Sequence, residues 1–428
     1  MSDYTTLNFA ELTALSLNLQ EKYETYRGRK LKLDMSRGKP CPEQLDLSMG
    51  MMDVLKIDDY LKASDGMDCR NYGGLDGIPE AKQLFAQMLG VDTNEIIIGG
   101  NSSLAMMHDT VARAMLHGVK GSDAPWGKLQ VVKFLCPSPG YDRHFAICEL
   151  FQIEMIVIDM LPDGPDMDTI EQLVSEDPAI KGIWCVPKYS NPDGITYSDE
   201  VVDRLAAMKT KAKDFTIIWD DAYTIHHLSS TPDSLKNILT ACRDAGNPDR
   251  VLMFSSTSKI SFAGSGIAMM AASMENLNLI KKQLAVQTIG PDKVNQLRHV
   301  RFFKDMDTIR THMEKQAAII QPKFDLVLTL LDSELSGKNI ATWNKPNGGY
   351  FISLNTLDGC AKAVVNMAAE AGVTLTKAGA TYPHGRDPRD RNIRIAPTFP
   401  SLAEMKDAIE VLCLCVQIVS IKKLISVL

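Results

Sequence analysis

Short apolar runs alternate with helical patterns between about residues 65 and 330, and this alternation limits the folds open to the chain. The apolar runs carry Ile, Val, Leu or Met on both faces, as strands do when helices cover both sides of a parallel sheet. They span residues 95–100, 129–137, 181–187, 215–221, 250–256 and 266–272. Helical patterns between them include residues 103–118 and 198–214. The order of elements therefore predicts an α/β fold with a mostly parallel sheet.

The pattern changes after a long helical stretch through the 320s. Shorter strand-like segments then follow at residues 347–354, 373–379 and 392–399, separated by helical patterns. At the other end of the chain, residues 8–27 have the pattern of an amphipathic helix. We predict three parts: an N-terminal arm with part of a small domain at residues 1–55, a large domain at residues 56–325, and a smaller α+β domain at residues 326–428.

Composition and charge exclude several classes of function. A net charge of −7 without a basic cluster argues against a nucleic-acid partner and against binding to a membrane surface. No apolar run approaches the roughly 20 residues that span a bilayer, and the polar N-terminus is unlike a secretory signal. Nine cysteines without a C-x-x-C pair are typical of free thiols in a reducing compartment. We therefore expect a cytoplasmic protein.

Adjacent histidines, His226 and His227, are the strongest hint of a metal site. Neighbouring residues on a strand point to opposite faces, so the pair could not bind one ion together. The sequence predicts no metal site.

Polar residues follow five of the predicted strands. In chain order they are Asn101, Ser102 and Ser103; Tyr141; Asn191; Asp220 and Tyr223; and Ser256, Ser258 and Lys259. Ligands bind outside the carboxyl ends of the strands in open parallel sheets. We therefore expect these side chains to converge on one crevice.

Lys259 is the least expected member of this group, because it lies between two segments that should be buried. Burying an unpaired ammonium is costly or lowers its pKa. A lysine amine can form a Schiff base with the aldehyde of pyridoxal phosphate. The same cofactor uses a carboxylate at its ring nitrogen, an aromatic side chain against its ring and a helix N-terminus at its phosphate. The strand-end residues therefore fit pyridoxal phosphate.

The motifs also resemble, in the same order, those of the class I/II aminotransferases, which are fold-type I pyridoxal-phosphate enzymes. They read "NYGGLDG", "GGNSSLA", "PSPGYDRH", "YSNPDG", "DDAY", "SSTSK" and "RNIRIAPTF", and they cover nearly the whole chain. The resemblance implies a mostly parallel, seven-stranded sheet between helices and a smaller α+β domain. It also implies a transaminase (EC 2.6.1) with ping-pong kinetics, similar to the aspartate aminotransferases.

The resemblance implies roles for the residues in these motifs. Lys259, Asp220 and Tyr223 are the expected catalytic residues: the Schiff-base lysine and proton carrier, the partner of the ring nitrogen, and a donor to the ring's 3-oxygen. The other expected cofactor-binding residues are Asn101, Ser102, Ser103, Tyr141, Asn191, Ser256, Ser258 and Tyr72. Tyr72 is expected to reach the phosphate of a neighbouring subunit, which implies a homodimer with shared sites.

For the substrate, the resemblance implies that Arg394 grips the α-carboxylate in a bidentate fork, with Gly38 and Asn191 beside it. The expected substrates are an amino acid such as aspartate or alanine and a 2-oxo acid, with 2-oxoglutarate favoured. A dicarboxylate needs a second cation, and Arg37, Arg298 and Arg301 are all candidates. The segment at residues 287–302 is expected near a partner subunit's site.

One departure from the family pattern concerns the phosphate. The usual arginine after the lysine is replaced within Gly264-Ser265-Gly266, a pattern closer to the alanine–glyoxylate or MocR-like subgroup. The sequence leaves open what compensates the phosphate charge. It also leaves open two other classes of function: elimination or decarboxylation with the same cofactor, and the effector domain of a MocR-type regulator.

Overall fold

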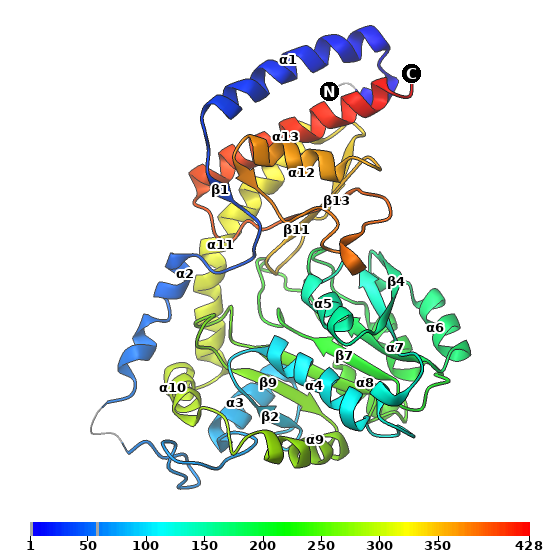
Figure 1. The fold of residues 1–428 in the computed structure, drawn as a ribbon. Helices are drawn as coiled ribbons and strands as arrows, with labels where there is room; N and C mark the ends of the chain where they lie inside the picture. The colour runs from blue at the N-terminus through cyan, green and yellow to red at the C-terminus, as the bar shows by residue number, and fades with distance from the viewer. Residues whose placement is uncertain (1–2, 57–59) are drawn as a thin grey trace.

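The computed structural model describes residues 3–56 and 60–428 (Figure 1). Its helices are α1 (Phe9–Gly28), α2 (Pro42–Asp46), α3 (Pro79–Leu89), α4 (Ser103–His117), α5 (Asp142–Leu150), α6 (Met167–Glu176), α7 (Asp199–Ala207), α8 (Ile238–Asp244), α9 (Met274–Gln287), α10 (Lys293–Phe303), α11 (Met306–Leu335), α12 (Ala361–Glu370) and α13 (Leu402–Ile425). Its strands are β1 (Leu33–Asp34), β2 (Ile96–Ile98), β3 (Lys133–Ser138), β4 (Glu154–Leu161), β5 (Gly164–Pro165), β6 (Ile180–Cys185), β7 (Thr216–Asp220), β8 (Val251–Ser256), β9 (Ala268–Ala272), β10 (Ala341–Trp343), β11 (Ile352–Thr356), β12 (Val373–Thr374) and β13 (Asn392–Ile395).

The central sheet has the strand order β2-β9-β8-β7-β6-β3-β4-β5. Neighbours from β8 through β4 run parallel, whereas β9 is antiparallel to both β2 and β8. The mostly parallel α/β fold is therefore confirmed. The sheet has eight strands among the described residues, not the expected seven, because the two-residue β5 folds back on the end of β4.

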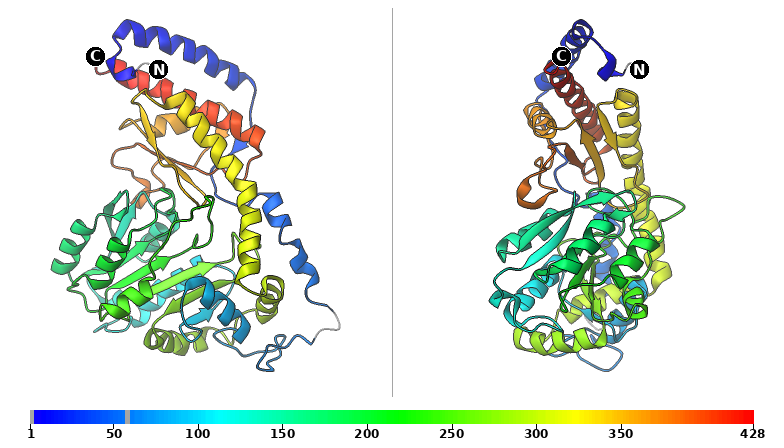
Figure 2. Two further views of the ribbon diagram at one scale, coloured as in Figure 1. Left: turned by 180° about the vertical axis from the view of Figure 1, so that it is seen from behind. Right: turned by 90° about the vertical axis from the view of Figure 1, so that its right-hand side faces the viewer.

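Successive side chains in the central strands alternate between two hydrophobic layers, which explains why these strands are apolar on both faces. In β7, Ile217 and Trp219 pack in one layer while Ile218 packs in the other. In β8, Met253 and Phe254 divide in the same way. Helices cover both sides of the sheet (Figure 2). This alternation follows from the two-residue period of a strand.

A third hydrophobic cluster joins the two ends of the chain. It is built on the antiparallel sheet β10-β11-β13 and on the parallel pair β1-β12. The predicted N-terminal helix is confirmed as α1, and it lies along α13 (Figures 1 and 2). The proposed domain limits at residues 56 and 325 stay predictions, since α11 continues across residue 325 with Pro322 inside it.

Two elements differ from the sequence pattern. The pattern at residues 198–214 predicted a longer helix, but α7 ends at Ala207. Arg250 explains the early end, because its Nη1 donates to the carbonyl oxygens of Ala206 and Met208 at 2.9 and 2.8 Å. Strand β4 was not predicted, and much of it is only partly buried.

In the described part of the chain, no helix has the length and apolar character needed to cross a membrane.

Candidate functional site

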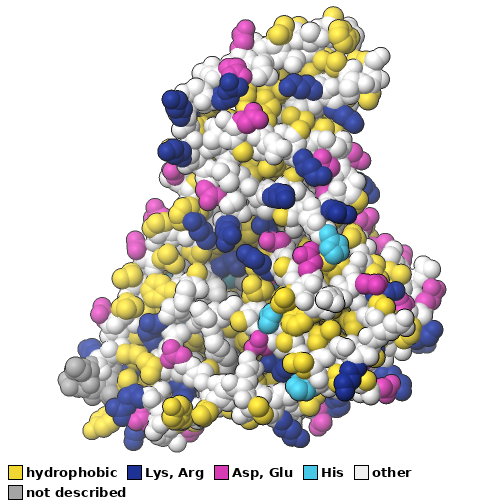
Figure 3. All heavy atoms as spheres, viewed as in Figure 1, with side chains coloured by type: hydrophobic (Ala, Val, Ile, Leu, Met, Phe, Trp, Pro, Cys, Tyr) yellow, Lys and Arg dark blue, Asp and Glu magenta, His cyan; other side chains and the backbone are white. Residues whose placement is uncertain are grey.

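A cavity of about 590 Å³ lies beyond the carboxyl ends of the central strands, beneath the C-terminal strands. Among the predicted site residues it is lined by Gly38, Ser102, Ser103, Tyr141, Asn191, Asp220, Tyr223, Ser256, Ser258, Lys259 and Arg394. Figure 3 shows Lys and Arg side chains gathered where the upper and lower parts of the molecule meet. The crevice expected from the strand ends is therefore present, and it contains most of the predicted residues.

The start of α4 forms one wall of the cavity. Ser102 is the N-cap residue, and its Oγ accepts a hydrogen bond from Ala105 N at 3.2 Å. The first N–H groups of a helix have no partner within the helix, so this end attracts anions. From the end of β8, Ser256 Oγ donates to Ser258 Oγ at 3.1 Å. Hydroxyls from two elements thus surround a helix N-terminus that suits a phosphate.

Asp220 ends β7 and is buried at the floor of the cavity. Its Oδ2 lies 3.1 Å from His144 Nε2, and the His144 ring stacks on Trp184 at a centroid distance of 4.3 Å. Its Oδ1 is buried and has no hydrogen-bond partner. A buried carboxylate oxygen without a partner is costly, so this atom points to a ligand group that donates a hydrogen bond.

Lys259 projects into the same cavity, close to two tyrosine rings. Its Nζ lies 4.8 Å from the centroid of Tyr223 and 5.7 Å from that of Tyr350. Burial lowers the pKa of Lys259, and the negative charge of Asp220 partly opposes that shift. Its Nζ makes no ion pair with any residue described. An amine with a lowered pKa is more often neutral, which suits both nucleophilic and basic roles.

Tyr141 and Tyr223 both line the cavity, near enough to Asp220 for its charge to act on their hydroxyls. Burial raises the pKa of Tyr141 to about 12, and the charge of Asp220 adds to the shift. Burial also raises the pKa of Tyr223. Both phenols therefore stay protonated at neutral pH and can act as hydrogen-bond donors.

Arg394 on β13 closes the cavity from above, and its side chain is only 7% exposed. Its Nη1 donates to Asn191 Oδ1 at 3.2 Å and to Asp142 Oδ1 at 3.1 Å. The guanidinium carbon lies 5.0 Å from the centroid of the Phe351 ring. Gly38 is needed beneath this ring, because a Cβ there would come within 2.5 Å of Phe351 Cζ. The arginine is thus held rigidly, as a carboxylate-binding residue should be.

Several predicted residues do not line this cavity. Asn101 lines a neighbouring cavity, and its Nδ2 donates to the Gly264 carbonyl at 3.1 Å. Tyr72 lies on the surface and is 80% exposed. Of the three candidate cations, only Arg37 reaches the cavity; Arg298 and Arg301 do not. Tyr72 stays a prediction, because its expected role requires a second subunit.

Arg298 lies instead at the glycine segment that lacks the family's arginine. Its Nη2 donates to Ser265 Oγ at 2.7 Å. A cation therefore reaches this segment from α10, although it does not line the cavity itself.

Sequence reasoning missed other charged residues at the cavity. Lys39, Asp142, Arg143 and Lys377 all line it. Two of them, with His144, lie in the quoted segment "PSPGYDRH", so their closeness to Tyr141 was a usable signal. Lys39 and Lys377 lie in segments that only the folded chain brings together.

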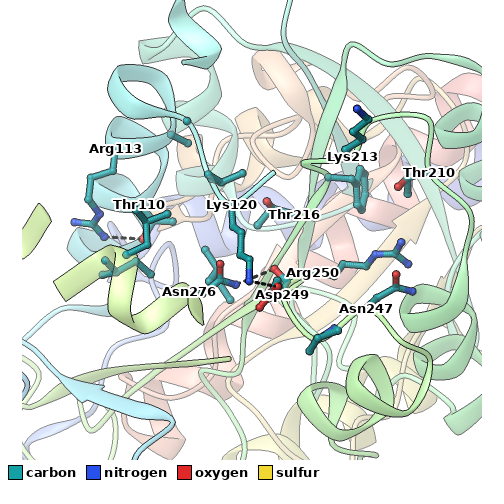
Figure 4. A pocket seen from close by; sticks show the side chains of 18 of the residues that line it. Thr110, Arg113, Lys120, Thr210, Lys213, Thr216, Asn247, Asp249, Arg250 and Asn276 are labelled. Carbon is teal, nitrogen blue, oxygen red and sulfur yellow. Dashed lines mark hydrogen bonds and ion pairs between the residues drawn. The ribbon is translucent and has the colours of Figure 1, made fainter. Parts of the chain in front are cut away.

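A second polar cavity lies at the opposite edge of the sheet (Figure 4). It is bordered by Thr216 at the start of β7 and by Arg250 just before β8, and Lys120 pairs there with Asp249 at 2.8 Å. It contains none of the predicted site residues. No cluster of His, Cys, Asp or Glu that could hold a metal occurs in the described ranges.

Comparison with known proteins identifies the family. The aspartate amino-transferase family model matches residues 7–427. An aspartate aminotransferase of Corynebacterium glutamicum is 44% identical over 399 residues, which cover 93% of this chain and 92% of that protein. A candidate aminotransferase of Mycolicibacterium smegmatis is 49% identical over 408 residues, 95% of each chain.

The likeness extends to three dimensions. The crystal structure of an aspartate transaminase from Corynebacterium glutamicum superposes with a TM-score of 0.96 at 41% sequence identity, and the match covers 99% of each chain. Sequence and structure agree over almost the full length, including every element that lines the cavity. The chain belongs to the aspartate aminotransferase family and is an aminotransferase.

Proposed function

We propose that this aminotransferase uses pyridoxal phosphate to move the amino group between a dicarboxylic L-amino acid, such as aspartate, and a 2-oxo acid, such as 2-oxoglutarate. One observation carries the proposal: the amine of Lys259, whose pKa is lowered, and the unpartnered Oδ1 of Asp220 share a cavity with Arg394. Transamination is favoured over elimination, decarboxylation and a regulatory role because the family consists of aminotransferases.

The cavity residues fit pyridoxal phosphate. The N-terminus of α4, with Ser102, suits its phosphate. Asp220 Oδ1 suits its protonated ring nitrogen, because that oxygen is buried and lacks a donor. Tyr141, Asn191 and Tyr223 line the same cavity, and we assign them to contacts with its ring and its 3-oxygen. When bound, the cofactor supplies an aldehyde that combines with amines and a ring that accepts electrons from the substrate's α-carbon.

The chain's own groups then bind the substrate and move the proton. Arg394 binds the α-carboxylate, and Phe351 beneath its guanidinium fixes the approach. Lys259 Nζ takes the proton from the α-carbon and later returns one, which its lowered pKa permits. Asp220 is held in position by its contact with His144.

We assign the second carboxylate of the substrate to Arg143. It lines the cavity, and its positive charge, like that of Arg394, acts on the Tyr141 hydroxyl. Arg37 and Lys39 instead lie near Asp34, and Lys39 is stacked on Phe399 at 3.8 Å. Arg143 has no hydrogen bond or ion pair with any described residue.

A homodimer and a cytoplasmic location complete the proposal. Tyr72, Val286 and Ile289 are exposed by 80, 91 and 62%, although such side chains are usually buried, and a partner subunit would cover them. All nine cysteines are buried and unpaired, which fits a reducing compartment.

Two measurements test the function. Borohydride should attach the cofactor permanently to the peptide that contains Lys259, and Lys259→Ala should abolish this labelling and nearly all turnover. In a panel of amino donors assayed with 2-oxoglutarate, aspartate should have a higher kcat/KM than alanine. The Arg143→Gln variant should reduce the ratio of these two kcat/KM values about 10-fold or more, because it loses a charge-assisted hydrogen bond to the second carboxylate. Lys377→Gln, at the same cavity, is the matched control. Multiple turnovers by Lys259→Ala would refute the proposal.

A further inference from the structure

A third polar cavity, of about 720 Å³, lies beside the catalytic cavity and is separate from it. It is bordered by the carboxyl ends of β3 and β4, the loop at residues 193–196, the end of β10 and the segment before β13. Its charged lining residues are Asp159, Asp193, Asp233, Lys345, Arg389 and Arg391. None of them takes part in the transamination described above.

Two hydrogen-bond donors at this cavity lack partners. Arg391 Nε and Trp343 Nε1 are both buried, and neither donates to any atom. The Arg391 guanidinium also makes no ion pair with the described residues. Leaving a buried donor unsatisfied is costly, and more so for a charged group. The same kind of orphaned atom, Asp220 Oδ1, marks the catalytic cavity.

The carboxylates of the cavity do not supply the missing acceptors, because most of them are engaged elsewhere. Asp233 accepts hydrogen bonds from Thr196 Oγ1 and Asn347 Nδ2 at 2.7 and 2.8 Å. The nearest basic group to Asp159 is Arg389, with Nη2 to Oδ2 at 4.0 Å.

Asp193 is buried, and its burial raises the pKa of its carboxyl to about 6, while the positive charge of Arg391 partly opposes that shift although the two side chains form no ion pair. The other cation, Lys345, is paired with Asp332 at 2.7 Å. Arg391 is thus the one cation described at this cavity that forms no ion pair.

From this arrangement we propose that the cavity is a second small-molecule site, which binds a carboxylate through Arg391 and Trp343. A guanidinium and an indole N–H that line one cavity offer donors of the kind that bind the oxygens of a planar anion. The amide side chains of Asn344, Asn347 and Asn355 line the remainder and suit a polar ligand. Both amino acids and 2-oxo acids carry the required group.

The site shares a loop with the catalytic cavity. Asn191 contacts Arg394 in the catalytic cavity, and Asp193 and Gly194 line the third cavity two and three residues later. Gly194 has a φ of +69° and packs so tightly that a Cβ would lie 2.4 Å from Pro346 Cβ. The loop is therefore fixed against the segment that follows Trp343.

Titration calorimetry on the holoenzyme tests the proposal, with succinate as a non-reacting probe and succinamide as its uncharged control. We expect two binding events per chain for the wild type and one in Arg394→Met, which lacks the catalytic carboxylate grip. Arg391→Met should keep the catalytic event and weaken the second by about 10-fold or more. Lys345→Gln, on the same cavity, should keep both. Titrating Arg394→Met with pyruvate and, separately, with alanine shows whether the site binds a 2-oxo acid or an amino acid.

Trp343→Phe removes only the indole N–H and keeps the test valid if Arg391→Met does not fold; it should weaken the second event about 5-fold. A single event in the wild type that disappears in Arg394→Met would overturn the proposal. So would a second event that survives both Arg391→Met and Trp343→Phe, or one seen with inorganic phosphate and not with any carboxylate. In each of these cases transamination itself would be unaffected.

Discussion

At the scale of single residues, the catalytic cavity is defined by a few buried groups that the folded chain leaves unsatisfied. Asp220 Oδ1 has no donor, and Lys259 Nζ has no ion-pair partner among the residues described. Both are costly in the absence of a ligand. The cavity is therefore organised in advance for a group that donates to one and reacts with the other.

The first prediction concerns Asp220→Asn. The variant keeps the side-chain volume but cannot hold a positive charge on a ring nitrogen, so we expect turnover to fall by about 100-fold or more. Steady-state kinetics with aspartate and 2-oxoglutarate measure this. His144→Gln is the matched companion, which should lower turnover less because Asp220 keeps its charge. Near wild-type turnover in Asp220→Asn would contradict the role assigned to this carboxylate.

The second prediction concerns pH and the stability of the apoprotein. The pKa of Lys259 is lowered on folding from its ordinary value of 10.5, so the cost of burying the charged amine is fully present below the lowered pKa. Between the two pKa values the unfolded chain binds more protons, and stability rises with pH. Lys259→Met should therefore unfold at a higher temperature than the wild-type apoprotein at neutral pH, and the gain should shrink toward pH 10.5. A gain independent of pH in thermal melts would argue against a buried charge.

At the scale of elements, the sequence correctly predicted that the polar residues after the strands meet at one crevice. This was possible because the topology of a parallel sheet brings the carboxyl ends of its strands together. Five parallel or neighbouring strands that end in polar residues must present them at one edge. Arg143 follows Tyr141 closely in the chain and was within reach of the same reasoning, but Lys39 and Lys377 could not be found as cavity residues in this way. Their positions depend on how the C-terminal strands are seated on the sheet, which no local pattern specifies. The early end of α7 likewise depends on Arg250, which lies far along the chain.

The third prediction belongs to α4, whose N-terminus serves both the helix and the ligand. Ser102→Ala removes the cap hydrogen bond and should destabilise the protein by about 1 kcal/mol. Ser102→Asp restores a cap but places a negative charge where a phosphate binds. Ser102→Asp should therefore weaken cofactor binding more than Ser102→Ala does. It should nevertheless be the more stable of these two variants. Ser401→Ala, at the cap of α13, is the control that should change stability alone. Thermal unfolding and cofactor titration, compared across the three variants, measure both effects.

At the scale of the whole molecule, the fold class and the family were predictable, whereas the function of Tyr72 lies beyond a single chain. The fourth prediction follows from its exposure. The Lys259→Ala homodimer and the Tyr72→Ala homodimer should each have reduced aminotransferase activity. Mixing them should restore activity, because a mixed dimer has one site with both Lys259 and the partner chain's tyrosine intact. Activity that does not rise after subunit exchange would show that Tyr72 does not act across the interface.

Helix α11 spans 30 residues, so it is a rod about 45 Å long that passes from the central sheet to the C-terminal strands. Pro322 interrupts its hydrogen-bond ladder, and a proline inside a helix weakens the rod at that point. Any tilt of the C-terminal strands that brings Arg394 closer to the sheet must bend this rod. The bend costs least at Pro322, which makes this residue the natural pivot for tightening the grip on a substrate.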